Sequence, residues 1–220
     1  MTYETISLRM DDRGVAYLTL NLPDKRNAIS AQMIAELHDF ATGVGADLNT
    51  RAVVLSGAGK LFCAGADLNW MKAQMNADRE TRMSEARKFA NMLRVLNEMP
   101  TPLIGRIHGS AYGGGVGLAC ICDIAVAEKG AKFALTETRL GLNPATIGPY
   151  VVARLGEGMA RRVFMSARIF DAAEAREIGL IAEIAPSDAL DATVEKYAVP
   201  YLSVAPGAVG SGKKLLRFLG

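Results

Sequence analysis

Cysteine and long apolar runs are both scarce in this sequence. Three cysteines in 220 residues are too few, and too unevenly spaced, for the disulfide framework of a small secreted protein. No apolar run approaches the ~20 residues that a membrane-spanning helix needs. Because residues 1–20 do not have the pattern of a secretory leader, we expect a cytoplasmic protein that makes no membrane contacts.

Histidine and an excess of charge of one sign are also lacking. The two histidines, His38 and His108, lie far apart and lack the spacing of a zinc-binding H-E-x-x-H helix, so we expect no metal site. The 25 lysines and arginines are nearly balanced by 23 aspartates and glutamates. Nucleic-acid-binding proteins usually carry a larger basic excess, so we expect no nucleic-acid partner. Basic pairs such as Lys213-Lys214 are expected on the solvated surface.

The overall composition is that of an ordinary folded protein. Half of the residues are hydrophobic and 22% are charged, which excludes a disordered chain, a collagen and a coiled-coil rod. A length of 220 residues suits one large domain or two small ones.

Strands and helices are predicted in alternation. The predicted strands span residues 6–10, 15–22, 52–55, 103–107, 123–127, 133–135 and 180–185, the first two as a hairpin. The predicted helices span residues 30–43, 78–99, 145–155, 157–166 and 171–179. Residues 61–71 are mixed in character and interrupted by Gly65, and no helix or strand is predicted there. Several strands are wholly apolar, so we predict an α/β fold whose parallel strands are covered on both faces.

A glycine-rich stretch late in the chain matches a phosphate-binding P-loop only in part. Residues 207–214 read GAVGSGKK, but Lys214 stands where the Ser or Thr that holds magnesium belongs. Pro206 also precedes the stretch, where a buried strand would lead into a P-loop. We therefore interpret these residues as the start of a helix with surface lysines.

Two other glycine-rich segments, 62–68 and 108–115, each follow a predicted strand. The second runs directly into a helix-like segment, so its backbone N–H groups lie at a helix N-terminus and favour an anionic oxygen. Two such loops that converge would form an oxyanion hole for an enolate. The alternative is tight packing of a helix on a strand, for which small residues are equally suited.

Three motifs in chain order give the sequence a family resemblance. Residues 62–68 read FCAGADL, residues 107–115 read IHGSAYGGG with Cys122-Asp123 after them, and residues 133–144 read FALTETRLGLNP. These motifs resemble the enoyl-CoA hydratase/isomerase (crotonase) superfamily, and the match is collinear over about residues 5–190.

The resemblance implies an architecture. It implies a crotonase-like α/β spiral of ββα units over residues 1–195, followed by a C-terminal helical segment that helps to form trimers. Residues 196–220 are expected to be an incomplete start of that segment. The implied assembly is a homotrimer or a hexamer made of two trimers.

The resemblance also implies roles for residues. The backbone N–H groups of Ala66 and Gly114 would bind the thioester oxygen, and Glu137 would be the general acid/base. The acyl-CoA substrate would bring its own CoA, so no separate cofactor is implied. The implied substrate-binding and CoA-binding residues are Lys25, Ala28, Ala64, Gly65, Ala66, Asp67, Leu68, Asn69, Gly114 and Gly117. For Glu137, the alternative is a surface carboxylate near Arg139.

One position departs from the pattern of the family. Many hydratases of the superfamily carry a second glutamate where this chain has Gly117. The sequence therefore leaves open two enzymes: a single-glutamate hydratase, with 3-methylglutaconyl-CoA of leucine or terpenoid breakdown as its candidate substrate, and a Δ3,Δ2-enoyl-CoA isomerase. A non-catalytic binding protein is the third alternative. The segments 67–71, 113–117 and 149–152 resemble the first group, and Trp70 would either line its substrate channel or serve in packing.

Overall fold

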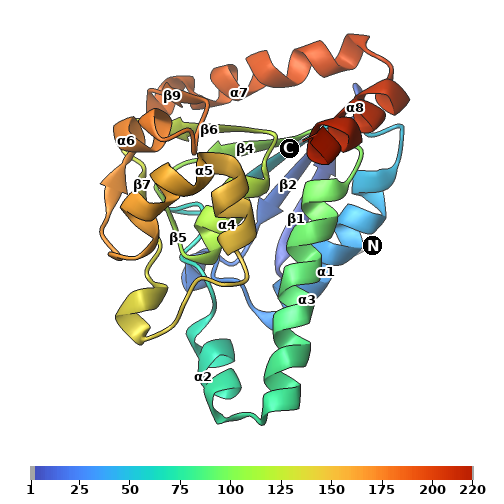
Figure 1. Ribbon diagram of the computed structural model, residues 1–220. Helices are drawn as coiled ribbons and strands as arrows, with labels where there is room; N and C mark the ends of the chain where they lie inside the picture. The colour runs from blue at the N-terminus through green and yellow to red at the C-terminus, as the bar shows by residue number, and fades with distance from the viewer. Residues whose placement is uncertain (1–2, 220) are drawn as a thin grey trace.

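The computed structural model describes residues 3–219, which form an α/β fold around a six-stranded sheet (Figure 1). Its strands, in spatial order, are β1 (Ile6–Met10), β2 (Val15–Leu20), β3 (Ala52–Gly57), β4 (Leu103–Ile107), β6 (Ile124–Glu128) and β9 (Glu183–Ala185). The hairpin of β1 and β2 is antiparallel and every other pair is parallel, so the predicted hairpin and the predicted parallel sheet are confirmed. Of the residue ranges given above, Met1-Thr2 and Gly220 lie outside the described residues.

A second, three-stranded sheet lies next to the first. It consists of β5 (Ser110–Tyr112), β7 (Lys132–Ala134) and β8 (Phe170–Asp171), in that order. β5 and β7 are parallel, and β7 and β8 are antiparallel. The sequence did not predict β5, which lies within the second glycine-rich segment, or β8, which has only two residues.

Three helices begin at a capped residue where the sequence predicts a start, whereas the helix predicted from residue 145 begins only at Gly148. The bounds of the helices are α1 (Ala31–Thr42), α2 (Leu68–Asn76), α3 (Arg79–Glu98), α4 (Gly114–Ile121), α5 (Gly148–Phe164), α6 (Ala172–Glu177), α7 (Leu190–Ala198) and α8 (Pro206–Leu219). The side chains of Ser30, Asp78 and Asp171 each accept a hydrogen bond from a backbone N–H in the first turn of the next helix. Gly156, with φ +72°, interrupts α5 at the boundary between the two helices that the sequence predicts.

Both faces of the parallel strands are buried, as the apolar runs predict. On one face, side chains of α1, α3 and α4 pack against the sheet in the main core, which includes Leu18, Leu55 and Leu93. On the other face, Leu190 and Val194 of α7 pack against the strands. The loops that follow the strands are therefore carried by a rigid two-sided scaffold.

No helix or strand was predicted for residues 61–71, but their last residues are helical, because α2 begins at Leu68. The side chain of Asp67 caps this helix by accepting a hydrogen bond from the N–H of Trp70 at 2.9 Å. No residue of α2 is buried. The spacing of Leu68, Met71 and Met75, which suits one face of a helix, is the sequence signal that could have predicted it. Together with the first half of α3, α2 projects from the body of the molecule (Figure 1).

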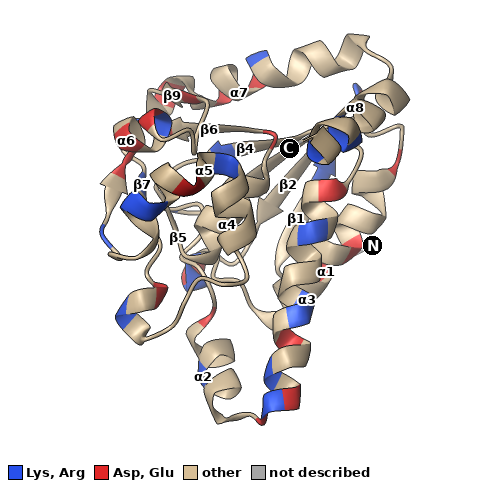
Figure 2. Ribbon diagram, viewed as in Figure 1, with Lys and Arg blue, Asp and Glu red and all other residues tan. Residues whose placement is uncertain are grey.

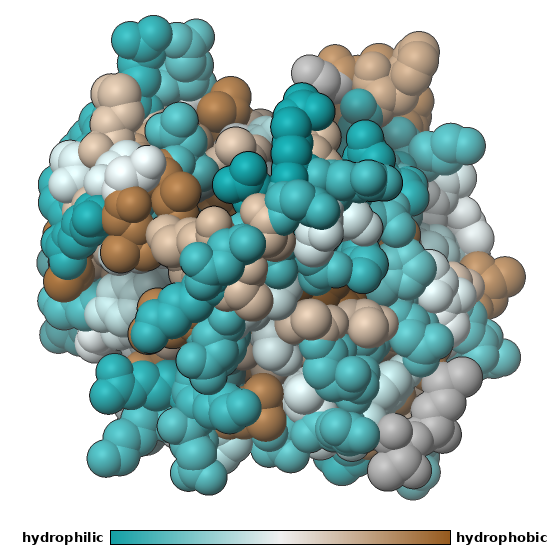
Figure 3. Space-filling model, turned by 90° about the horizontal axis from the view of Figure 1, so that it is seen from below, coloured by the Kyte–Doolittle hydropathy of each residue, from teal (hydrophilic) through white to brown (hydrophobic). Residues whose placement is uncertain are grey.

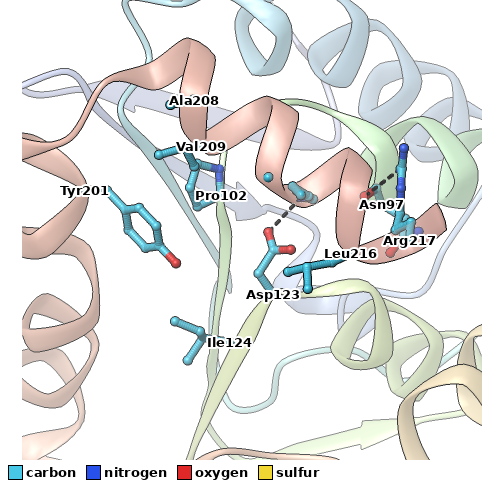
Figure 4. A pocket seen from close by; sticks show the side chains of 11 residues that line it. Asn97, Pro102, Asp123, Ile124, Tyr201, Ala208, Val209, Leu216 and Arg217 are labelled. Atoms are coloured by element: carbon cyan, nitrogen blue, oxygen red, sulfur yellow. Dashed lines mark hydrogen bonds and ion pairs between the residues drawn. The ribbon is translucent and has the colours of Figure 1, made fainter. Parts of the chain in front are cut away.

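The helix predicted at residues 207–214 exists as part of α8, but the surface position of Lys213 is wrong. The Lys213 side chain is only 10% exposed, and its Nζ lies 2.7 Å from Oδ2 of Asp123 (Figure 4). The same Oδ2 accepts a hydrogen bond at 2.7 Å from the N–H of Leu103, the first residue of β4. This ion pair fixes α8 to the sheet.

Lysine and arginine alternate with aspartate and glutamate along the helices and loops (Figure 2). Along α3, Lys88 pairs with Glu85 and Arg94 pairs with Glu98, at 2.6 and 2.9 Å. Within residues 3–219, no helix is long and apolar enough to cross a membrane.

Candidate active site

The two glycine-rich loops are joined by backbone hydrogen bonds. The N–H of Ile29 donates to the carbonyl of Gly65 at 2.8 Å, and the N–H of Asp67 donates to the carbonyl of Ile29 at 2.9 Å. On the other side, the N–H of Tyr112 donates to the carbonyl of Cys63 at 3.0 Å. The first loop is thus held between the segment that precedes α1 and the strand that leads into α4, and the predicted convergence is present.

The backbone N–H groups of Ala66 and Gly114 have no hydrogen-bond acceptor among the described residues. The groups on either side of Ala66 bond to Ile29, so in an extended segment the N–H of Ala66 points the opposite way. Gly114 is the first residue of α4, where N–H groups lack partners within the helix. A Cβ at Gly114 would lie 3.9 Å from the nitrogen of Ala66, so the two groups are neighbours.

Close backbone approach explains the glycines around these two groups. Gly65 and Gly113 have φ of +95° and +49°, in the region where side chains cause strain. A Cβ at Gly65 would also lie 2.9 Å from the carbonyl oxygen of Tyr112. At Gly114, a Cβ would meet Cδ1 of Ile29 at 2.9 Å and the ring of Phe89 at 3.3 Å, so these side chains form an apolar wall.

Glu137 lies at the same place, at the start of a 3-10 helix, Glu137–Leu140, that follows β7. Its Oε1 lies 3.0 Å from the position that a Cβ at Gly113 would take. Its Oε2 is buried and has no hydrogen-bond partner among residues 3–219. Burial raises the pKa of the carboxyl, although backbone N–H groups of Glu137 and Thr136 oppose the shift.

The alternative reading of Glu137, a surface carboxylate near Arg139, is not what the structure shows. The Arg139 guanidinium donates to the carbonyl of Ala167 at 2.7 Å instead. Glu137 therefore forms no ion pair among the described residues, and its buried Oε2 has no hydrogen-bond partner there.

Gly117 lies one turn beyond Gly113 on α4 and is covered by Ile147. A Cβ at Gly117 would lie 2.5 Å from Cγ2 and 3.0 Å from Cβ of Ile147, which is only 3% exposed. An aliphatic side chain thus fills the space beside Gly117. A larger side chain at this position requires Ile147 to move.

Of the residues predicted to bind substrate or CoA, Lys25, Ala28 and residues 64–69 lie on two connected loops, whereas Gly117 is buried on α4 under Ile147. Lys25 ends a short 3-10 helix, Pro23–Lys25, and is exposed, whereas Ala28 is nearly buried. The N–H of Ala64 donates to the carbonyl of Arg26 at 3.0 Å, which ties this loop to the first glycine-rich loop. Leu68 and Asn69 are exposed at the start of α2.

Trp70 and Asn27 make contacts that the sequence did not predict. The indole N–H of Trp70 donates to Glu85 at 3.1 Å, and its ring meets Phe89 edge-on at a centroid distance of 6.2 Å. Asn27 is completely buried, and no sequence signal marks it as part of the site. No group of metal-ligating side chains that could hold an ion is present among residues 3–219.

These loops follow the carboxyl ends of β3 and β4, which is where parallel sheets usually bind ligands. The cavity of about 450 Å³ beneath α8 lies elsewhere, lined by residues such as Pro102 and Ile124 at the amino ends of β4 and β6 (Figure 4). From below, the side on which α2 projects, the surface is mostly hydrophilic with separate hydrophobic groups (Figure 3).

Known proteins match both the sequence and the fold. The family model for enoyl-CoA hydratase/isomerase matches residues 11–215. A Mycobacterium tuberculosis protein named probable enoyl-CoA hydratase is 37% identical over 191 residues, which are 86% of this chain and 72% of the relative. The mitochondrial methylglutaconyl-CoA hydratase of Mus musculus is 34% identical over 183 residues, which are 80% of this chain and 56% of that protein.

The solved structure of an enoyl-CoA hydratase from Shewanella pealeana superposes with a TM-score of 0.94 at 37% identity. The match covers 98% of this chain and 80% of that one. The crotonase fold that the three motifs predict is thereby confirmed. The chain belongs to the enoyl-CoA hydratase/isomerase family.

Proposed function

We propose that this protein is an enoyl-CoA hydratase, which adds water reversibly to the double bond of a 2-enoyl-CoA thioester. One observation carries the proposal: the carboxyl of Glu137, whose buried Oε2 has no partner and whose Oε1 faces Gly113, lies beside the backbone N–H groups of Ala66 and Gly114, which have no acceptors. A proton-transferring group and two oxyanion donors thus share one site.

The two N–H groups suit the charge that develops during hydration. As the water oxygen bonds to C3, electrons of the double bond move onto the thioester oxygen and form an enolate. Preorganised donors at that oxygen stabilise the enolate more than the substrate, and one such donor changes kcat by about 10²–10³-fold. Ala66 and Gly114 supply these donors from backbone atoms, which a side-chain substitution does not remove.

Glu137 can carry out both proton steps alone. As a carboxylate it takes a proton from the attacking water, and as a carboxylic acid it returns a proton to C2 of the enolate. The net change is the addition of one water molecule and a regenerated carboxylate. Burial raises the pKa of Glu137, which brings the acid and base forms closer in energy at neutral pH and favours both steps.

The substrate would bind along the edge formed by Lys25, Ala28 and the loop 64–69. The exposed ammonium of Lys25 suits a CoA phosphate, and the neighbouring small residues allow CoA to lie against the backbone. CoA enters as part of the substrate, so no other cofactor takes part. A trimeric or hexameric assembly in the cytoplasm belongs to the same proposal.

For the substrate we propose 3-methylglutaconyl-CoA, whose acyl group is branched. The name of the mouse relative supports this choice, and the wall of Ile29 and Phe89 beside Gly114 suits a branched chain. A Δ3,Δ2-enoyl-CoA isomerase is the second candidate. Glycine at position 117, covered by Ile147, favours it, because isomerisation moves one proton and needs a single base.

The test follows the loss of conjugated-thioester absorbance with crotonyl-CoA and 3-methylglutaconyl-CoA side by side. The expected result is turnover of both, with a higher kcat/KM for the branched substrate, and loss of turnover in E137Q. Hydration in H₂¹⁸O must place the label in the product, whereas isomerisation of a 3-enoyl-CoA leaves the product unlabelled. Turnover of the 3-enoyl-CoA alone would replace the hydratase proposal with the isomerase.

A further inference from the structure

Asn27 is a buried polar residue with every side-chain hydrogen-bonding group in use. It is 0% exposed, and its φ of +53° is a left-handed conformation that asparagine tolerates better than most residues. Its Oδ1 accepts from the N–H of Leu22 at 3.0 Å. Its Nδ2 donates to the carbonyls of Ala58 and Leu61 at 2.8 and 2.9 Å.

These bonds join the loop that contains Lys25 and Ala28 to the turn that follows β3. A Cβ at Gly57 would lie 2.8 Å from Nδ2 of Asn27 and 2.5 Å from the carbonyl oxygen of Phe62. The amide therefore occupies a space that exists because residue 57 is a glycine. It holds the turn from both ends, immediately before the segment that carries Ala66.

The neighbours of Asn27 continue the connection to Ala66. The carbonyl of Arg26 accepts from the N–H of Ala64, and the backbone of Ile29 bonds to the residues on each side of Ala66. Asn27 lies between these contacts in the chain and fixes the turn that leads into the loop. The position of the Ala66 N–H thus depends on a side chain that does not reach the site.

We propose that Asn27 is a positioning residue for the oxyanion donor at Ala66. This inference rests on the proposed function, because it assigns the N–H of Ala66 to the thioester oxygen. Without the amide, the carbonyls of Ala58 and Leu61 lose their donors and the turn relaxes. The N–H of Ala66 then moves relative to Gly114, which weakens enolate stabilisation more than CoA binding.

The main test variant is N27G. Glycine adopts the left-handed conformation without strain, so this change removes the side-chain bonds and leaves the backbone unstrained. The matched control is N49G, because Asn49 is exposed and its amide bonds only to Asp47. We expect kcat of N27G to fall about 10- to 100-fold with KM within about threefold of the wild type, and both constants of N49G to be unchanged.

A second readout does not depend on turnover. Acetoacetyl-CoA has an acidic C2, and its enolate absorbs in the near ultraviolet. Binding to a formed oxyanion hole raises the enolate fraction, which difference absorbance measures directly. We expect N27G to bind this probe with a much smaller enolate signal than the wild type, at a temperature where circular dichroism shows both to be folded.

N27D is the second test variant, for use if N27G does not fold. A carboxylate at this position accepts from Leu22 but faces the carbonyls of Ala58 and Leu61 without a proton to donate. Protonation restores one donor, so the enolate signal of N27D relative to the wild type should rise as the pH falls. A merely structural role would lower stability without this recovery of the signal.

The outcomes separate this inference from the proposed function. If the wild type hydrates no enoyl-CoA but N27G loses the enolate signal, the proposed function fails and the positioning role of Asn27 stands. If folded N27G keeps both the wild-type kcat and the enolate signal, the positioning role is overturned. The same holds if KM alone rises, because Asn27 would then serve CoA binding only.

Discussion

The side chain of Ile147 fills the space beside Gly117, where a Cβ atom would lie 2.5 Å from its Cγ2. Gly117 is part of α4 and Glu137 lies beside the start of that helix, but only Glu137 carries a carboxylate. The contact between Ile147 and Gly117 therefore excludes a second acid/base side chain at this position without a rearrangement of the loop before α5.

G117A should be less stable than the wild type by about 1–3 kcal/mol, because the added methyl group overpacks against Ile147. I147A removes the closer contact, with Cγ2, but keeps the Cβ of residue 147 at 3.0 Å, and it has its own cost of about 2–5 kcal/mol for a buried isoleucine. In the I147A background, the G117A change should therefore cost less than in the wild type. Urea unfolding of the four proteins measures the coupling. An equal loss of stability in both backgrounds would show that the two residues do not compete for this space.

E137Q should be more stable than the wild type at neutral pH. The folded state raises the pKa of Glu137, so it holds the proton more tightly than the unfolded state does. The free energy of unfolding of the wild type therefore falls as the pH rises through the interval between the two pKa values. The advantage of E137Q should be full above the folded pKa and vanish below the unfolded one.

Thermal unfolding at several pH values measures this difference. E157Q is the control, because Glu157 is exposed and its ion pair with Arg161 lies in solvent, where such pairs contribute little to stability. A stability advantage of E137Q that stays constant down to acidic pH would contradict the argument. Such a result would mean that burial of the charge is not what distinguishes the two proteins.

The pH dependence of turnover should report the same carboxyl. The base form of Glu137 is needed to take a proton from water, so kcat/KM should fall on the acid side as Glu137 is protonated. Because burial raises its pKa, this acid limb should lie above the usual range for a glutamate. Circular dichroism over the same pH range must show a folded protein. An acid limb within the usual range would mean that Glu137 is not the group that limits turnover.

Sequence reasoning succeeded where the signal is local. Ser30, Asp78 and Asp171 lie within three residues of the N–H groups they cap, so the pattern of the chain contains both partners. The convergence of the glycine-rich loops was predicted from their placement after strands and from the family resemblance. The roles of Ala66, Gly114 and Glu137 stay predictions, although the structure places these residues together.

Sequence reasoning failed where partners are distant in the chain. Asn27 bonds to carbonyls more than thirty residues away, and backbone carbonyls leave no trace in the residue types of a sequence. Lys213 pairs with Asp123 across ninety positions, so its charge predicted a solvated surface site that the fold does not provide. The helix α2 was missed although Leu68, Met71 and Met75 are spaced as on one helix face, and none of its residues packs in the core.

The ion pair of Lys213 and Asp123 gives a last prediction, on stability. Lys213 is 10% and Asp123 29% exposed, so removal of the ammonium leaves a partly buried carboxylate whose Oδ2 retains only the Leu103 N–H. K213M keeps the aliphatic part of the side chain, and it should lower the free energy of unfolding by about 2–4 kcal/mol. K214M, at an exposed neighbour, should change it by less than about 0.5 kcal/mol.

Urea unfolding of both variants, and of D123N/K213M, tests whether the pair or the packing carries the effect. If the unpaired carboxylate causes the loss, D123N should restore part of the stability of K213M, because a neutral amide carries no charge to leave without its partner. Equal stability of K213M and the double variant would instead assign the loss to the packing of α8 against the sheet. Equal effects of K213M and K214M would show that the ion pair does not fix α8 at all.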